Sequence, residues 1–375
     1  MTILDRYLLR KFLTPFVYCL LGFLGIWFIF DLSDNLQDFM QGKATFDVLL
    51  AYYASQVPQI IVLSLPIVLL LALLYSLTAM SRSNEIISMM GAGLSLIRII
   101  TPLIGVGIAL SAVSAYFNFD SAPHAAAVRK QMLTEIKRGE KRDFKIKGHL
   151  FRNREDLRTW YVNSFVVEKG VLSEVQIIQQ NEQGDILKKW YAREAVYDPA
   201  LKRWTLGNAR VVEMDAAGEV VSSEGRSVMV IDGWSETPWR ISSSVMNPEF
   251  LSVPELNNYL EFNSDFPAKR LVPYLTHWHY RWALPLVCLV VVFLAAPMGI
   301  VYSRRGILGG VAIAIGLFFL LFFVSSLFVA LGKGSRIPPT FAAWAPLIFF
   351  MGIGFFLLWY RSTNRDLPKL KIPGF

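Results

Sequence analysis

Few residues of this chain are arranged as they are in an enzyme or a metal site. The stretch Leu331–Ser335 reads like part of a nucleotide-binding P-loop, but position 327 is leucine where that motif requires glycine. No GxSxG or HExxH pattern occurs, and His277 and His279 have no acidic residue or cysteine close by in the sequence. We therefore expect no catalytic site, no metal site and no bound cofactor.

The composition is instead typical of a membrane protein. Of 375 residues, 54% are hydrophobic and only 18% are charged, and the apolar residues lie in long runs. Six runs are long enough to cross a bilayer as a helix. They are Phe12–Phe30, Pro58–Ala79, Leu96–Phe119, Trp282–Val301, Ile307–Leu331 and Phe341–Tyr360. We expect a membrane α-helical fold with three spans on each side of a large insert.

The predicted spans hold almost no ionisable residue. Arg98, near the end of a span, is the exception, and the strongest interior polar groups are Gln56, Gln59, Ser325 and Ser326. Carriers driven by an ion gradient usually place acids, bases or histidines within their spans. The sequence therefore favours a permease whose energy comes from a separate ATPase.

The basic residues indicate the orientation. With the N-terminus in the cytoplasm, the predicted inner segments carry eleven bases and three acids, as the positive-inside rule requires. The predicted outer loop after the first span has Lys43 as its only base. The net charge of +8 is therefore a sign of topology and not of nucleic-acid binding. We expect both termini to be cytoplasmic and the insert to lie outside.

A short amphipathic segment, Arg82–Ser95, lies between the second and third predicted spans. Its apolar residues recur at spacings of three and four, which predicts a helix over about 83–95. An acid at its start complements the helix dipole, and glycine would end it. Such a helix either transmits force between the spans and a cytoplasmic partner or simply lies on the membrane surface. The candidate coupling residues are Glu85, Ile86, Met89, Met90 and Gly91.

The insert, residues 120–275, separates the spans of 1–119 from those of 276–375. It begins with a helical, basic stretch, Ala122–Lys147, and Asn247–Pro267 reads as a linker back to the membrane. Between them, short alternating runs broken by turn residues predict an antiparallel sandwich or open barrel of about 100 residues. These runs are Thr159–Val167, Glu174–Gln180, Ile186–Tyr197, Arg203–Glu213 and Glu219–Ile231.

Four stretches in this order resemble the permeases of the LptF/LptG family, which export lipopolysaccharide from the inner membrane of Gram-negative bacteria. They are ILDRYLLRKF, SNEIISMMGAGLS, REAVYDPALKRWTL and RIPPTFAAWAP. The resemblance extends over essentially the whole chain, and the chain looks more similar to LptG than to LptF. It implies six spans with an inserted periplasmic β-jellyroll.

The resemblance also implies partners and a lipid path. Glu85 would engage the groove of a cytoplasmic, LptB-like ATPase dimer. A second related permease would pair with this one around a cavity built mainly from the first and fifth spans. The jellyroll would pass lipopolysaccharide to LptC-like and LptA-like jellyrolls. Candidate residues of the lipid path are Phe30, Asp31, Asp34, Lys43, Phe318 and Phe322.

One position departs from the LptG pattern. Members of that type tend to carry lysines at the outer end of the first span, whereas this chain has Asp31 there. A ligand rich in phosphate would be repelled unless the second permease, a divalent cation or the basic segment Arg129–Lys147 compensates. That basic segment also reads as a solvated helix surface. Two other functions stay open: a permease for another glycolipid or a lipoprotein, and a scaffold that transmits force without a lipid path.

Overall fold

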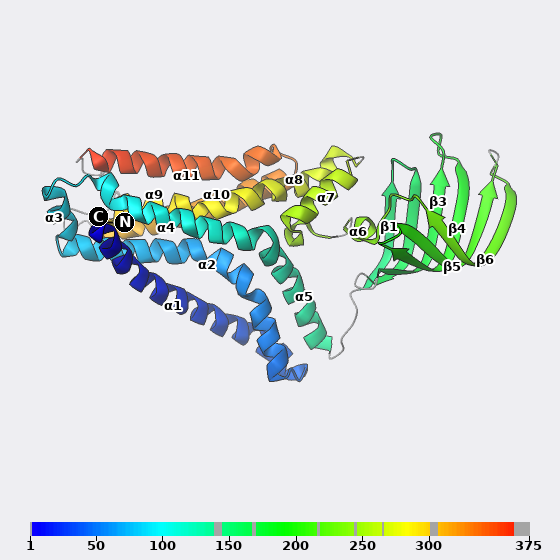
Figure 1. Cartoon of the computed structure of the whole chain (residues 1–375), viewed down its shortest axis with the longest axis horizontal. Coiled ribbons are helices and arrows are strands. Elements are labelled where there is room, and N and C mark those ends of the chain that lie inside the picture. The colour runs from blue at the N-terminus through cyan, green and yellow to red at the C-terminus, as the bar shows by residue number, and fades with distance from the viewer. Residues whose placement is uncertain are drawn as a thin grey trace, which may run out of the picture. The chain divides into compact units, whose positions relative to one another are not determined.

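The computed structural model describes residues 2–138, 145–166, 170–215, 218–243, 246–264, 266–300 and 307–363. The chain forms two compact units, a helical unit (Met1–Met132, Pro248–Leu256 and Leu271–Phe375) and a β unit (Leu133–Asn247 and Asn257–Arg270). Figure 1 shows the helices and the strands of each. The predicted cytoplasmic tail after residue 363 and the predicted inner bases Arg304 and Arg305 lie outside the described residues.

Six helical segments of the described chain are long and apolar enough to cross a membrane, so the predicted six spans are confirmed. Two of them are compound: α4 continues through a π-helical turn into α5, and α8 continues through a 3-10 turn into α9. These six segments are built from α1 (Ile3–Gln41), α2 (Phe46–Arg82), α4 (Leu96–Tyr116), α5 (Ala122–Arg138), α8 (Ala268–Ala283), α9 (Val287–Gly299), α10 (Ile307–Lys333) and α11 (Pro339–Ser362). The shorter helices are α3 (Glu85–Gly91), α6 (Pro238–Ser243) and α7 (Val253–Phe262).

Several helices are longer than the apolar runs that predicted them. The acidic stretch after Phe30, expected to be an outer loop, is helical and belongs to α1 as far as Gln41. The N-terminus of α1 begins in a capping box, in which Thr2 and Asp5 satisfy each other's backbone N–H groups. The prediction that Asn247–Pro267 is a linker is wrong in part, because this stretch contains α7 (Val253–Phe262) and a 3-10 turn.

The core of the helical unit lies around α2 and the α8–α9 segment. In their most hydrophobic windows, 72% and 78% of the residues are buried, against 17% in both α1 and α10. Glycines let neighbouring helices approach closely: Gly107 meets Val292, Gly299 meets Leu77, and Gly354 meets Phe293. The first and fifth spans are therefore the two with the least protein around them.

Gly332 of α10 offers a test of this packing. A methyl group added there would lie 2.6 Å from Cβ of Ala342 and 2.9 Å from Cγ2 of Thr276, so Gly332→Ala should destabilise the purified protein by about 1–3 kcal/mol. Gly316→Ala is the matched control on the same helix, because nothing lies within 4 Å of its added methyl group. Thermal unfolding in detergent should show a lower Tm for Gly332→Ala only; an equal Tm in both variants would contradict the packing.

The β unit is one six-stranded antiparallel sheet whose strands follow each other in sequence order, and Figure 1 shows it as strongly curved. The predicted all-β insert is confirmed. The first strand was missed: Lys145–Lys147, expected at the end of a helix, begin β1, and α5 ends at Arg138. The strands are β1 (Lys145–Asn153), β2 (Arg158–Val166), β3 (Val171–Gln180), β4 (Ile186–Asp198), β5 (Arg203–Met214) and β6 (Val220–Asp232).

Aromatic side chains form the core of the β unit. Alternate residues of β2 are buried, and Trp160 and Trp204 have no exposed surface. The rings of Trp160 and Trp204 lie 5.0 Å apart, and Trp234 contacts the rings of both Trp160 and Trp190. A curved sheet with this interior buries large apolar rings without a second sheet of similar size among the described strands.

Candidate functional site

The candidate coupling helix exists but is short. Helix α3 (Glu85–Gly91) follows Asn84, whose positive φ of 59° and lack of a side-chain cap show that Asn84 precedes the helix without capping it. Gly93, with φ of +89°, ends the segment where other residues would be strained. The predicted span of about 83–95 is thus reduced to seven helical residues and the turns on either side.

The candidate coupling residues of α3 differ in burial. Ile86 is buried in the core of the helical unit, and Met89 and Met90 pack partly against that core. Gly91 is exposed, and nothing would lie within 4 Å of a methyl group added there. The apolar face of α3 is therefore anchored to the spans, and the Gly91 end is open to a partner.

Glu85 is the best-connected residue of α3. Its carboxylate accepts hydrogen bonds from Tyr7 Oη at 2.8 Å and Ser83 Oγ at 2.9 Å, and Nζ of Lys11 lies 3.6 Å away. Burial alone would raise the pKa of Glu85, but these hydrogen bonds and the Lys11 charge outweigh it and hold the pKa below its usual value. The carboxylate is therefore ionised at neutral pH, and it ties α3 to the first turns of α1.

A second ion pair fastens the same end of α1. Arg98 of α4 lies 2.9 Å from a carboxylate oxygen of Asp5 and also donates to the hydroxyl of Thr2 at 3.2 Å. Sequence reasoning missed Tyr7, Lys11 and Asp5 as partners of this region. No local pattern could have found them, because Tyr7 and Glu85 are 78 residues apart and Asp5 and Arg98 are 93 apart.

The candidate residues of the lipid path differ in exposure. The side chain of Phe30 is 66% exposed, and Asp34 and Lys43 are also exposed. Phe318 is only 4% exposed and packs against Phe322, which is half-buried, with 4.8 Å between ring centroids. The exposed rings of α10 are those of their neighbours, Phe319 and Phe323.

Asp31 is the candidate whose surroundings differ most from expectation. It is buried at the far end of α1, where Oδ1 lies 2.7 Å from a guanidinium nitrogen of Arg129 and Oδ2 accepts from Tyr52 at 3.1 Å. The basic segment is thus not simply a solvated surface, because Arg129 forms an ion pair. This pair offsets the charge of Asp31, whereas Asp34 of the same acidic stretch is exposed; the repulsion of a phosphate-rich ligand stays a prediction.

Comparison with known families decides what kind of protein combines these features. A family model described as "Lipopolysaccharide export system permease LptF/LptG" matches residues 6–360. The chain belongs to the LptF/LptG family. A comparison with curated proteins gave no match. The predicted family is confirmed, and the chain is a membrane transporter component; the prediction that it is closer to LptG stays a prediction.

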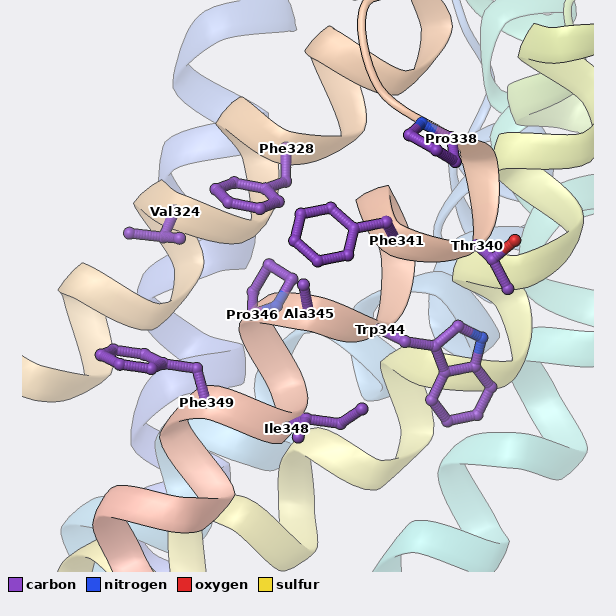
Figure 2. Close-up of a pocket in the computed structure, with 10 residues that line it drawn as sticks. All are labelled: Val324, Phe328, Pro338, Thr340, Phe341, Trp344, Ala345, Pro346, Ile348 and Phe349. Atoms are coloured by element: carbon purple, nitrogen blue, oxygen red, sulfur yellow. The ribbon is translucent and has the colours of Figure 1, made fainter.

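The helical unit of this LptF/LptG permease also has an apolar groove between α10 and α11, with a volume of about 900 Å³ (Figure 2). Figure 2 shows Phe328 of α10 and Phe341 of α11 side by side, and their ring centroids lie 5.9 Å apart. Thr340 provides the only hydroxyl among the lining side chains. Such a lining suits hydrocarbon, and its side chains offer a polar ligand little beyond the Thr340 hydroxyl and the Trp344 indole N–H.

The described part of this permease offers no donor set for a metal: it contains no group of three or more histidine, cysteine, aspartate or glutamate side chains placed to hold an ion. His277 lies on α8 with Glu249 as its nearest acid, at 3.9 Å. Cys19 and Cys288 are free thiols on different helices.

Proposed function

We propose that this permease is one of two related subunits of an ATP-driven exporter that extracts lipopolysaccharide from the bacterial inner membrane. It would pass the lipid to a periplasmic bridge of LptC-like and LptA-like jellyrolls. The observation that supports this best is the family match, because residues 6–360 include both the spans and the β unit. The predicted positive-inside orientation gives cytoplasmic termini and a periplasmic β unit.

An LptB-like ATPase dimer would dock on α3 from the cytoplasm. The exposed Gly91 end would contact the ATPase, and the buried Ile86 with Met89 and Met90 would transmit its movement to the spans. Glu85 would act on both sides, because 25% of its side chain is exposed while its carboxylate binds Tyr7 of α1. Two ion pairs support this division of roles: Glu85 with Lys11 joins α3 to α1, and Arg98 with Asp5 joins α4 to α1.

The lipid path would run along α1 and α10. Both carry large exposed apolar side chains and have the lowest buried fraction of the six spans. A second permease facing these helices would enclose a cavity lined by Phe30 on α1 and by Phe319 and Phe323 on α10. Phe318 and Phe322 would support those rings from behind, and Asp34 and Lys43 would lie at the outer rim.

Photo-crosslinking tests this path. With a benzophenone amino acid at position 30, the exporter complex in membranes is expected to capture lipopolysaccharide, because Phe30 is exposed. The same amino acid at position 318 is the matched control and should capture at least several-fold less lipid, because Phe318 is buried. Capture of another glycolipid at position 30 would mean that this glycolipid, and not lipopolysaccharide, is the cargo. Capture of protein alone would support a scaffold that transmits force.

A further inference from the structure

Helix α1 has buried residues only towards its two ends. Its buried residues are Asp5, Leu8, Phe12 and Pro15 near the N-terminus and Asp31, Asn35 and Phe39 near the C-terminus. Within α1, which is described throughout, no residue from 16 to 30 is buried. The middle of the helix touches α2 through partly exposed rings, such as Phe28 on Tyr53 with 4.6 Å between centroids, so the buried contacts that hold α1 lie towards its ends.

The two ends are held differently. At the N-terminal end, the Asp5–Arg98 and Glu85–Lys11 pairs have side chains that are partly open to solvent. At the C-terminal end, the side chain of Arg129 is 37% exposed, but that of Asp31 is only 3% exposed and Tyr52 is fully buried. The guanidinium of Arg129 binds Asp31 and also donates to Tyr52 Oη at 3.4 Å. This end of α1 is thus joined to both α2 and α5.

The contact of Asp31 with Arg129 and Tyr52 joins α1 to α2 and α5, and the buried carboxylate determines when this joint can open. Removal of a buried charge's partner leaves an uncompensated charge, which is strongly unfavourable, whereas water can hydrate both groups if the helices separate. The ring of Phe39 packs on Tyr52, with centroids 5.4 Å apart, and closes the cluster on its other side. The joint is therefore stable when closed and can open where water or a ligand replaces the lost contacts.

We propose that Asp31, Arg129 and Tyr52 form a latch that holds the outer end of α1 against α2 and α5 and that opens when lipid passes between α1 and the bundle. The passage of lipid in this proposal rests on the proposed function. Asp31, Arg129 and Tyr52 are then positioning residues, and none of them needs to touch the cargo. The acid at position 31 has a role that lysine could not fill, because lysine would repel Arg129.

Pulsed electron–electron double resonance, which measures the distance between two spin labels, tests the latch on the purified full-length complex. Spin labels at Met40 of α1 and Val128 of α5, both exposed, report the distance between the two helices once Cys19 and Cys288 are replaced. Wild type should give a narrow distance distribution. Arg129→Met, which keeps an unbranched apolar stem but removes the charge and the hydrogen-bond donors, should broaden the distribution and shift it to longer distances.

The charge exchange Asp31→Arg with Arg129→Asp should restore a narrow distribution, and Arg98→Gln at the other end of α1 is the matched control that should leave it unchanged. An unaltered distribution in Arg129→Met overturns the proposal. A second readout uses a photo-reactive residue in place of Trp27, whose ring contacts Tyr53 of α2 at 6.2 Å. Its capture of lipid should rise several-fold in Arg129→Met, and no rise would also overturn the latch.

These results separate the latch from the proposed function. The distance measurement requires neither ATP hydrolysis nor a bound lipid. If position 30 captures no lipid in wild type while Arg129→Met broadens the distribution, the export function fails and the joint between α1 and α5 stands. If position 30 captures lipid and the distribution does not change, the export function stands and the latch fails.

Discussion

Replacement of Glu85 by alanine is expected to weaken the docking of the cytoplasmic ATPase on this permease by about tenfold or more. A hydrogen bond to a charged group contributes about 1.5–3 kcal/mol, and about 1.4 kcal/mol corresponds to a factor of ten in affinity. The substitution also removes the acceptor of Tyr7 and Ser83, so that α3 loses its connection to α1. The amount of ATPase that co-purifies and its rate of ATP hydrolysis measure the effect.

Two further variants show which contact of Glu85 matters. Tyr7→Phe removes one hydroxyl and leaves the carboxylate in place, so docking should persist while ATP hydrolysis becomes less coupled to lipid release. Ser88→Ala is the matched control on α3, because the hydroxyl of Ser88 donates to the carbonyl oxygen of Asn84, four residues before it. Unchanged complex yield and ATP turnover in Glu85→Ala would remove the role that we assign to this residue.

The positions of the spans and of α3 could be predicted because they depend on local patterns. Long apolar runs and the spacing of Ile86, Met89 and Met90 are visible in one short window of sequence. The end of α1 could not be predicted in this way. Asp31 reads as the start of an outer loop, and its partners there, Tyr52 and Arg129, lie 21 and 98 residues later in the sequence.

The exposed face of α10 was also beyond sequence reasoning. This helix is apolar on all sides, so its periodicity does not distinguish the buried Phe318 from the exposed Phe319. In the β unit, alternation of apolar and polar residues predicted five strands; β2 has buried residues at alternate positions over Arg158–Val162, whereas β6 has none. The first strand escaped because its Lys145 and Lys147 continued a basic run that was helical up to Arg138.

Glu236 is a fully buried acid of the β unit, and it leads to the second large expected effect. Its side chain has no exposed surface, and Arg158 at the start of β2 donates to its two oxygens at 2.9 and 3.0 Å. Asn153 donates a third hydrogen bond at 2.9 Å. A carboxylate held by two parallel hydrogen bonds from an arginine is strongly oriented. Glu236 therefore fixes the segment after β6 to the end of β1 and the start of β2.

Arg158→Met is therefore expected to destabilise the β unit by about 3–5 kcal/mol, because it leaves Glu236 buried without its partner. Hydrogen exchange of the amides of β2 and β5 in the full-length protein measures the free energy of opening directly. Arg158→Met combined with Glu236→Leu should recover most of the loss, since no charge is then buried. The exposed pair of Lys188 and Glu213 provides the control: Lys188→Met should leave exchange unchanged. Equal exchange in Arg158→Met and Lys188→Met would mean that the buried pair does not hold the sheet, and the stability of the β unit would then rest on its tryptophan core alone.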